Sequence, residues 1–190
     1  MKALPVPRFN ALWLVLMAVM VATRFKHFGD ALHLPDASMA VFFLGGLYLR
    51  QHWTFVVMVL LGVALDWVSI SYAGVSDFCI TLAYAFLPLA YAVLWYAGRW
   101  YAPRMDGRAM SYAGAFLVAL LATIGSFAIS NGAFYWLGGR YASPYMGEYL
   151  ARLWQWGPLF VRTTISYVVV ALVLHATITR FASSTTHREA

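Results

Sequence analysis

The sequence contains very little charge. Only 11% of its 190 residues are Asp, Glu, Lys or Arg, whereas 63% are hydrophobic. A soluble domain carries about 25% charged residues, and so little charge leaves too little polar surface to cover a water-facing globule. The scarcity of charge therefore argues against a soluble protein and favours an integral membrane protein.

The sequence is equally poor in cysteine and in the motifs of several familiar chemistries. Cys79 is its one cysteine, which excludes an internal disulfide. It contains no zinc-ligand spacing, nucleophile elbow, phosphate-binding glycine loop or His-x-x-x-His pair. These absences argue against a membrane protease, an ATPase and a haem-bundle cytochrome.

The net charge of +6 does not point to nucleic acid. The basic residues lie mainly between apolar runs, where Lys and Arg set the orientation of a membrane protein. No basic run is interleaved with aromatic residues. We therefore expect the lipid bilayer, and no nucleic acid, as a partner.

Apolar runs recur along the whole chain and predict an all-α integral membrane protein. They are continuous, whereas an outer-membrane strand would alternate polar and apolar residues over about 10 positions. Pro88 is expected to kink the fourth helix. One domain over residues 1–181 is predicted, followed by a flexible polar tail at 182–190. The six expected spans are Phe9–Thr23, Pro35–Leu49, Trp53–Tyr72, Phe78–Ala97, Ala109–Leu137 and Gly157–Ile178.

Positive charge predicts the orientation of these spans. Eight of the 13 Lys and Arg residues lie at the termini and in the second and fourth loops, and five lie in or beside the first, third and fifth. The excess places both termini in the cytoplasm, so loops one, three and five face outward.

The stretch from Asp66 to Tyr84 carries the most unusual residues. Asp66 interrupts an apolar run, so it is expected to face a cavity or a partner, or to be a structural acid bonded to a helix neighbour. Cys79 is expected at the start of the fourth helix, where the helix dipole favours a thiolate, a soft ligand for a transition metal. The alternative for Cys79 is a small apolar filler.

Further polar residues are expected on the same outer face. His27 follows the first span and is either a ligand or an interfacial histidine in water. Tyr84 is expected to line a cavity wall. The aromatic segment 138–158 predicts either a helix lying on the membrane or a lid in which Arg152 holds a polar group of a large flat ligand.

Three stretches carry a resemblance to a known family: RFKHFGDALHLPDAS, LDWVSISYAGVSDFCITLAY and YLARLWQWGP. With six spans in 190 residues and an A-x-x-x-A pattern at Ala18 and Ala22, the chain resembles the substrate-binding S-components of energy-coupling-factor (ECF) vitamin transporters. Within that group it resembles the BtuM family of proteobacterial cobalamin transporters. The resemblance implies a six-helix transmembrane bundle of the ECF S-component type in the bacterial inner membrane.

The resemblance also implies what the site binds. Cobalamin (vitamin B12) would enter a periplasm-facing site and be taken up as the bound substrate, and no free metal is expected. Cys79 matches the expected cobalt ligand, which would help to remove the upper cyano ligand. His27, Asp66, Tyr84 and Arg152 match the polar residues of the site. An ECF-type ATPase module is a possible partner that would dock at Ala18 and Ala22.

Two other functions remain open from the sequence. One is a structural membrane subunit of similar fold that binds no corrinoid. The other is a membrane enzyme with Cys79 as nucleophile, for which His27 is the candidate base.

Overall fold

The computed structural model describes residues 9–24, 34–49 and 51–186. Every regular element within these residues is helical, as the apolar runs predict, and no strand occurs among them. The α-helices are α1 (Phe9–Arg24), α2 (Ser38–Tyr48), α3 (His52–Tyr72), α4 (Leu87–Tyr101), α5 (Ala109–Leu137) and α6 (Met146–Thr186). Short 3-10 helices are η2 (Asp77–Cys79), η3 (Leu82–Phe86) and η4 (Ala102–Arg104).

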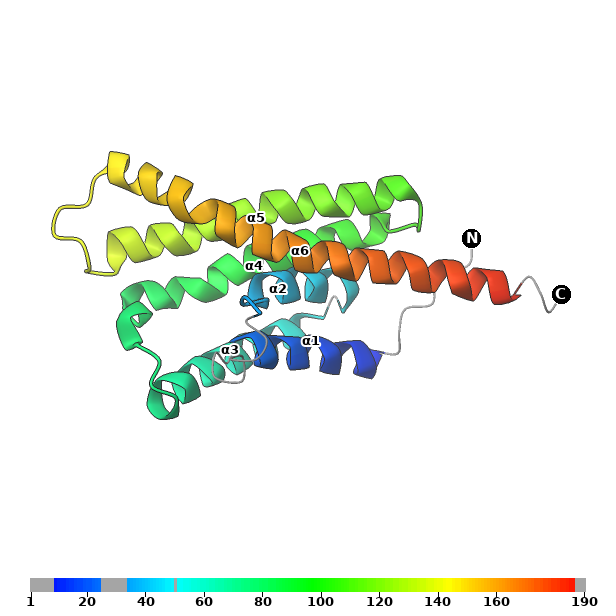
Figure 1. Cartoon of the computed structure of the whole chain (residues 1–190), viewed down its shortest axis with the longest axis horizontal. Coiled ribbons are helices and arrows are strands. Elements are labelled where there is room, and N and C mark those ends of the chain that lie inside the picture. The colour runs from blue at the N-terminus through cyan, green and yellow to red at the C-terminus, as the bar shows by residue number, and fades with distance from the viewer. Residues whose placement is uncertain (1–8, 25–33, 50, 187–190) are drawn as a thin grey trace.

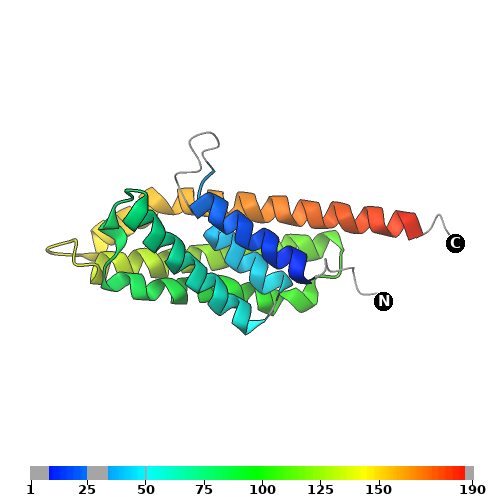
Figure 2. The ribbon, with the colours of Figure 1, turned by 90° about the horizontal axis from the view of Figure 1, so that it is seen from below.

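The α-helices lie side by side along the long axis of the molecule (Figure 1). At one end, the α5–α6 end, α3 terminates and α5 connects to α6. At the opposite end, the α4–α5 end, α1 and α3 begin and α4 connects to α5 (Figures 1 and 2). Helix α6 continues past the other helices beyond the α4–α5 end. The beginning of α1 and the end of α6 therefore lie toward the same end.

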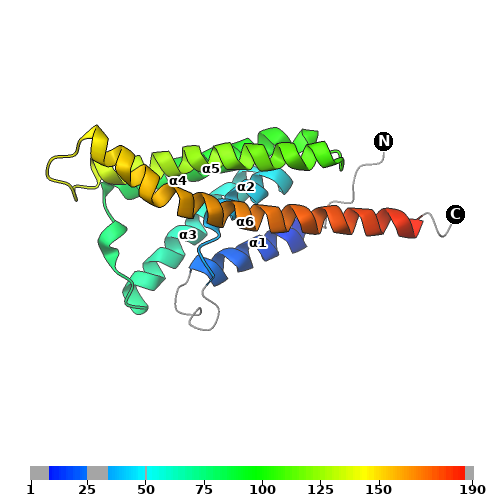
Figure 3. The same cartoon turned by 45° about the horizontal axis from the view of Figure 1, so that its top comes forward.

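Helix α2 forms the centre of the bundle. All its residues from Ala40 to Leu47 are buried, and it packs on α1, α3, α4 and α6. In Figure 3, α1 and α3 lie on one side of α2, and α4 and α5 lie on the other. A Cβ atom at Gly46 would overlap the carbonyl oxygen of Trp95, and one at Gly98 would overlap that of Phe43. Glycine at these two positions therefore lets the backbones of α2 and α4 touch.

Within the part of the chain that the structure describes, three helices are long and apolar enough to cross a membrane: α3, α5 and α6 over Met146–Phe181. Helices α1 and α2 are apolar but shorter. The 11 residues of α2 extend over roughly 16 Å, about half of a hydrocarbon core of about 30 Å. The structure is thus compatible with a membrane protein, although it gives three candidate spans where six were predicted.

The prediction of a continuous fourth span from Phe78 to Ala97 is wrong. Residues 73–86 form turns and the 3-10 helices η2 and η3, and α4 begins only at Leu87. The predicted kink at Pro88 is wrong as well, because this proline lies in the first turn of α4. A proline is accommodated there because the first N–H groups of a helix have no intrahelical acceptor.

The predicted fifth loop is mostly helical. Only residues 138–145 separate α5 from α6, and α6 passes through Pro158 without ending. The prediction for α5, Ala109–Leu137, is confirmed at both ends. Residues 182–186 of the predicted flexible tail continue α6, and residues 187–190 lie outside the described part of the chain.

Candidate functional site

A partly buried arginine–aspartate pair joins α1 to α3. The Nε of Arg24 donates to Oδ1 of Asp66 over 2.7 Å, and its Nη2 donates to Oδ2 over 2.5 Å. The side chain of Arg24 is 9% exposed and that of Asp66 is 23% exposed. Two parallel charge-assisted bonds compensate both charges. This pairing explains how a carboxylate is tolerated inside the otherwise apolar helix α3.

The same guanidinium reaches two further helices. Its Nη1 donates to Oγ of Ser38 in α2 over 2.9 Å and to the hydroxyl of Tyr91 in α4 over 2.8 Å. It also lies 3.6 Å from Oδ2 of Asp36, whose Oδ1 accepts the Ser38 hydroxyl over 2.6 Å. One side chain at the end of α1 therefore holds α1, α2, α3 and α4 together.

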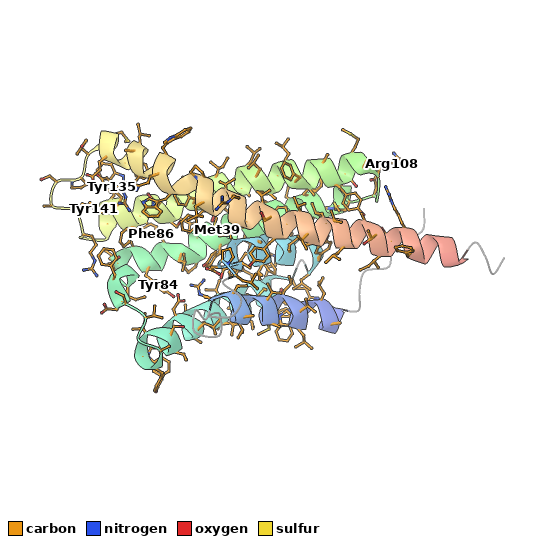
Figure 4. The ribbon with its side chains drawn as sticks, in the orientation of Figure 1. Met39, Tyr84, Phe86, Arg108, Tyr135 and Tyr141 are labelled. Carbon is orange, nitrogen blue, oxygen red and sulfur yellow. The ribbon has the colours of Figure 1, made fainter. Side chains whose placement is uncertain are left out.

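Tyr84 completes this group, which we call the Arg24 network: Arg24, Asp36, Ser38, Asp66, Tyr84 and Tyr91. The hydroxyl of Tyr84 donates to Oδ2 of Asp66 over 2.7 Å. Tyr84 lies in η3, and Figure 4 shows it between η3 and α3. Both oxygens of Asp66 are thus occupied by protein donors. Asp66 orients Arg24 and Tyr84, and is poorly suited to act as a metal ligand itself.

A small cavity lies beside the Arg24 network, between α3 and α4. Its volume is about 10 Å³, and its lining includes Arg24, Gly62, Tyr84 and Tyr91. That volume accommodates about one water molecule. A larger ligand does not fit in this cavity.

Cys79 lies within segment 73–86. Its backbone ends η2, whose first turn is capped by Ser76 Oγ accepting from the N–H of Phe78 over 3.2 Å. The predicted placement at the N-terminus of the fourth helix is wrong, because α4 begins at Leu87. The dipole of α4 therefore gives no support for a thiolate at Cys79. The side chain of Cys79 and the whole of His27 lie outside the described residues.

Arg152 belongs to a second group of side chains, between α5 and α6. Its guanidinium carbon lies 4.9 Å from the ring centroid of Tyr141 and 5.9 Å from that of Tyr135. The Tyr135 hydroxyl donates to Glu148 Oε2 over 2.8 Å and accepts the N–H of Tyr145 over 2.8 Å. We call these five residues the Tyr135 cluster. It fixes the connection between α5 and α6 (Figure 4).

Arg140 ties the segment that carries Cys79 to this connection. Its Nη2 donates to the carbonyl oxygen of Phe78 over 3.0 Å, and its guanidinium lies 4.7 Å from the centroid of the Phe78 ring. Phe78 also packs on Phe134 of α5, with ring centroids 5.7 Å apart. Segment 73–86 is thus bonded to Asp66 through Tyr84, and to the α5–α6 connection through Phe78.

The five predicted site residues do not form one cluster in the structure. Asp66 and Tyr84 are in direct contact, and Arg152 packs in the Tyr135 cluster. Cys79 lies on the backbone segment that joins the two groups, and the placement of His27 is not described.

Sequence reasoning missed Arg24 as part of the site. It counted Arg24 only as a basic residue of the first loop, although Asp66 was expected to have a partner. The available signal was one arginine ending an apolar run and one aspartate inside another. The role of Tyr135 was missed as well, because nothing in its spacing indicates the bond to Glu148.

Several buried polar atoms near the α5–α6 end have no hydrogen-bond partner among the described residues. They are Oγ of Ser69, one turn after Asp66 in α3, Oδ1 of Asn131, one turn before Tyr135 in α5, and Nε of Arg152. Buried polar atoms normally have partners, and water is small enough to serve enclosed atoms such as these three.

Comparisons with family models and with curated proteins find no match to this chain.

Proposed function

We propose that the protein binds cobalamin at the α5–α6 end of a bundle of the ECF S-component type and mediates its uptake across the bacterial inner membrane. The observation that supports this most is the position of segment 73–86. This segment carries Cys79, and it is bonded to Asp66 through Tyr84 and to the α5–α6 connection through Arg140. The backbone segment of the single cysteine thereby lies between two polar and aromatic side-chain groups at one end of an apolar bundle.

The chemistry of cobalamin matches this arrangement. Cobalamin has a broad, flat corrin ring, amide groups around its rim and a cobalt ion that accepts an axial ligand. A site for it needs one soft ligand, hydrogen-bonding groups for the amides, and aromatic surface for the ring. Because the corrin holds the cobalt, the protein supplies only the axial ligand, which we assign to Cys79.

The hydrogen bonds of the predicted site residues suggest how each side chain would interact with cobalamin. The Tyr84 hydroxyl gives its hydrogen to Asp66, so its oxygen remains free to accept an N–H of a corrin amide. The guanidinium of Arg152 would donate to an amide carbonyl. Asp66 is a positioning residue for Tyr84. His27 remains a second candidate ligand-binding residue.

Removal of the cyano ligand is a substitution at cobalt. A lone pair of the Cys79 thiolate forms the cobalt–sulfur bond, and the cobalt–carbon bond breaks with its electron pair leaving on cyanide. Cyanide then takes a proton from water. The cobalt keeps its oxidation state, so the step needs neither an oxidant nor a reductant.

Active transport would require a partner, and α1 offers one face for it. Ala18 and Ala22 are exposed on this helix, so an ATPase module could pack closely against them. A bulky substitution, Ala22→Trp, would block that contact and abolish ATP-dependent uptake. Unchanged uptake in this variant would contradict docking at this face. It would not contradict the proposed binding of cobalamin.

Uptake of radiolabelled cobalamin tests the function. The protein is expressed in cells that lack any other inner-membrane route for the vitamin, beside the Cys79→Ala variant. We expect accumulation with the wild type and a severe loss with the variant. Accumulation no higher than in cells with an empty vector would contradict uptake. It would favour the structural subunit, or the cysteine enzyme if Cys79 reacts with acyl analogues.

A further inference from the structure

A basic hollow lies at the α4–α5 end, far along the bundle from the proposed cobalamin site. It has a volume of about 700 Å³ and opens to the surface at the end of α4. Its lining residues are Tyr96, Arg99, Trp100, Pro103 and Arg104. Two of these five residues are cationic and none is acidic. The hollow therefore favours a ligand with negative charge.

The aromatic wall fixes one of the two guanidinium groups. Arg104 lies over the Trp100 ring, with its guanidinium carbon 4.1 Å from the centroid. Its Nη1 donates to the Trp100 carbonyl oxygen over 2.6 Å. That bond uses one of the five N–H donors of a guanidinium, so donors remain for a ligand. Stacking and the hydrogen bond together hold a planar cation at the edge of the hollow.

The position of the hollow is that of a membrane interface. Helices α3 and α5, both of spanning length, begin at this end. Trp100 is 59% exposed and Tyr96 is 45% exposed, as expected of aromatic side chains at the level of lipid headgroups. His52 of α3 contacts the Tyr96 hydroxyl over 2.9 Å, which ties the wall to a spanning helix.

Arg108 provides an internal contrast. It lies at the same end, before α5, but its side chain is 80% exposed and pairs with Asp106 over 3.6 Å (Figure 4). The backbone N–H of Arg108 also donates to Asp106 Oδ1 over 3.0 Å, and this bond lowers the pKa of the Asp106 carboxyl. Asp106 thus remains ionised and neutralises Arg108, which does not line the hollow.

We propose that this hollow binds the phosphate headgroup of an anionic phospholipid. Arg99 and Arg104 would hold the phosphate, while Trp100 and Tyr96 would lie against the glycerol and the upper acyl chain. A free phosphate has no apolar part for the two aromatic side chains to contact. The combination of paired cations with an aromatic wall therefore favours a lipid over a free anion.

Native mass spectrometry of the full chain, delipidated in detergent, tests the proposal. The probe is phosphatidylglycerol, with phosphatidylcholine as the neutral lipid and inorganic phosphate as a competitor. Arg104→Gln and Arg108→Gln each remove one positive charge from the same end. We expect Arg104→Gln to weaken phosphatidylglycerol binding about tenfold, since one charge-assisted bond is worth at least about 1.4 kcal/mol. Arg108→Gln should leave binding within about twofold of wild type.

Arg99→Gln is the second test variant, because Arg99 is the other cationic residue that lines the hollow. It should also weaken phosphatidylglycerol binding. Equal losses in the Arg104 and Arg108 variants would show general charge attraction and overturn the proposal. Displacement of the lipid by millimolar phosphate would show a general anion site that does not recognise the glycerol or acyl chain, and would contradict the proposal. Equal retention of phosphatidylcholine would also contradict the assignment.

Discussion

Arg24 and Asp66 form a bidentate pair between α1 and α3, with two hydrogen bonds of 2.7 and 2.5 Å. The pair lies 42 residues apart in sequence and has little exposure to solvent. It makes the position of Asp66 depend on α1. Because Tyr84 donates to the same carboxylate, the orientation of Tyr84 depends on α1 as well.

Removal of one member of this pair should be more harmful than removal of both. Asp66→Asn leaves Arg24 with only the half-exposed Asp36 as a counter-charge, so we expect a loss near the lower end of the roughly 3–5 kcal/mol that breaking a buried pair costs. The double variant Arg24→Gln/Asp66→Asn should recover part of that loss. Thermal unfolding in detergent measures both. Strictly additive losses in the two single variants and the double variant would contradict a direct coupling.

Tyr84→Phe should weaken cobalamin binding with little damage to the fold. The substitution removes the bond to Asp66, worth about 1.5 kcal/mol of stability for a half-buried group, and the oxygen offered to the corrin. We expect affinity to fall about tenfold. Tyr91→Phe is the matched control, because it removes another hydroxyl of the Arg24 network that is buried in the bundle. Equal losses of affinity in both variants would indicate a structural effect only.

Arg140→Gln should loosen the segment that carries Cys79. It removes the bond to the Phe78 carbonyl oxygen and the contact with the Phe78 ring. Amide hydrogen exchange across residues 76–82 should become faster, while exchange in α5 stays unchanged. Arg162→Gln, an exposed arginine farther along α6, serves as the control. Unchanged exchange at 76–82 would mean that Arg140 does not hold this segment.

Gly46→Ala should disrupt the packing of α2 on α4. The added methyl group would overlap the carbonyl oxygen of Trp95, and backbone atoms cannot move aside as a flexible side chain can. We expect a loss of about 3 kcal/mol in thermal or denaturant unfolding. Gly125→Ala in α5 is the control, since its methyl group would meet only Val93 Cγ1 at 3.8 Å. Similar stability in the two variants would contradict this packing.

Local sequence predicted some of the fold well. The bounds of α5 follow from a mostly apolar run without any charged residue between Arg108 and Gly138. The error at the fourth helix has a physical cause. Phe78, Ile80 and Leu82 continue the apolar pattern into α4, yet they are exposed in turns and 3-10 helices. Hydrophobicity alone does not distinguish an apolar turn at a membrane surface from the first turns of a helix.

The site could be predicted only in part. A lone acid in an apolar run predicts a partner, and the structure supplies Arg24. The identity of that partner depends on how α1 and α3 pack, which no local pattern encodes. The grouping of Arg152 with Tyr135 and Tyr141 depends in the same way on the start of α6 at Met146, earlier than the sequence indicated.

A visible absorption spectrum tests the central claim most directly. Wild-type protein and Cys79→Ala are each purified in detergent after expression with cobalamin. We predict that a corrin spectrum accompanies the wild type, and that its bands differ in the variant because the cobalt–sulfur bond is lost. Identical corrin bands in both proteins would contradict the role of Cys79. A colourless wild type that also fails to bind added cobalamin would contradict cobalamin binding itself.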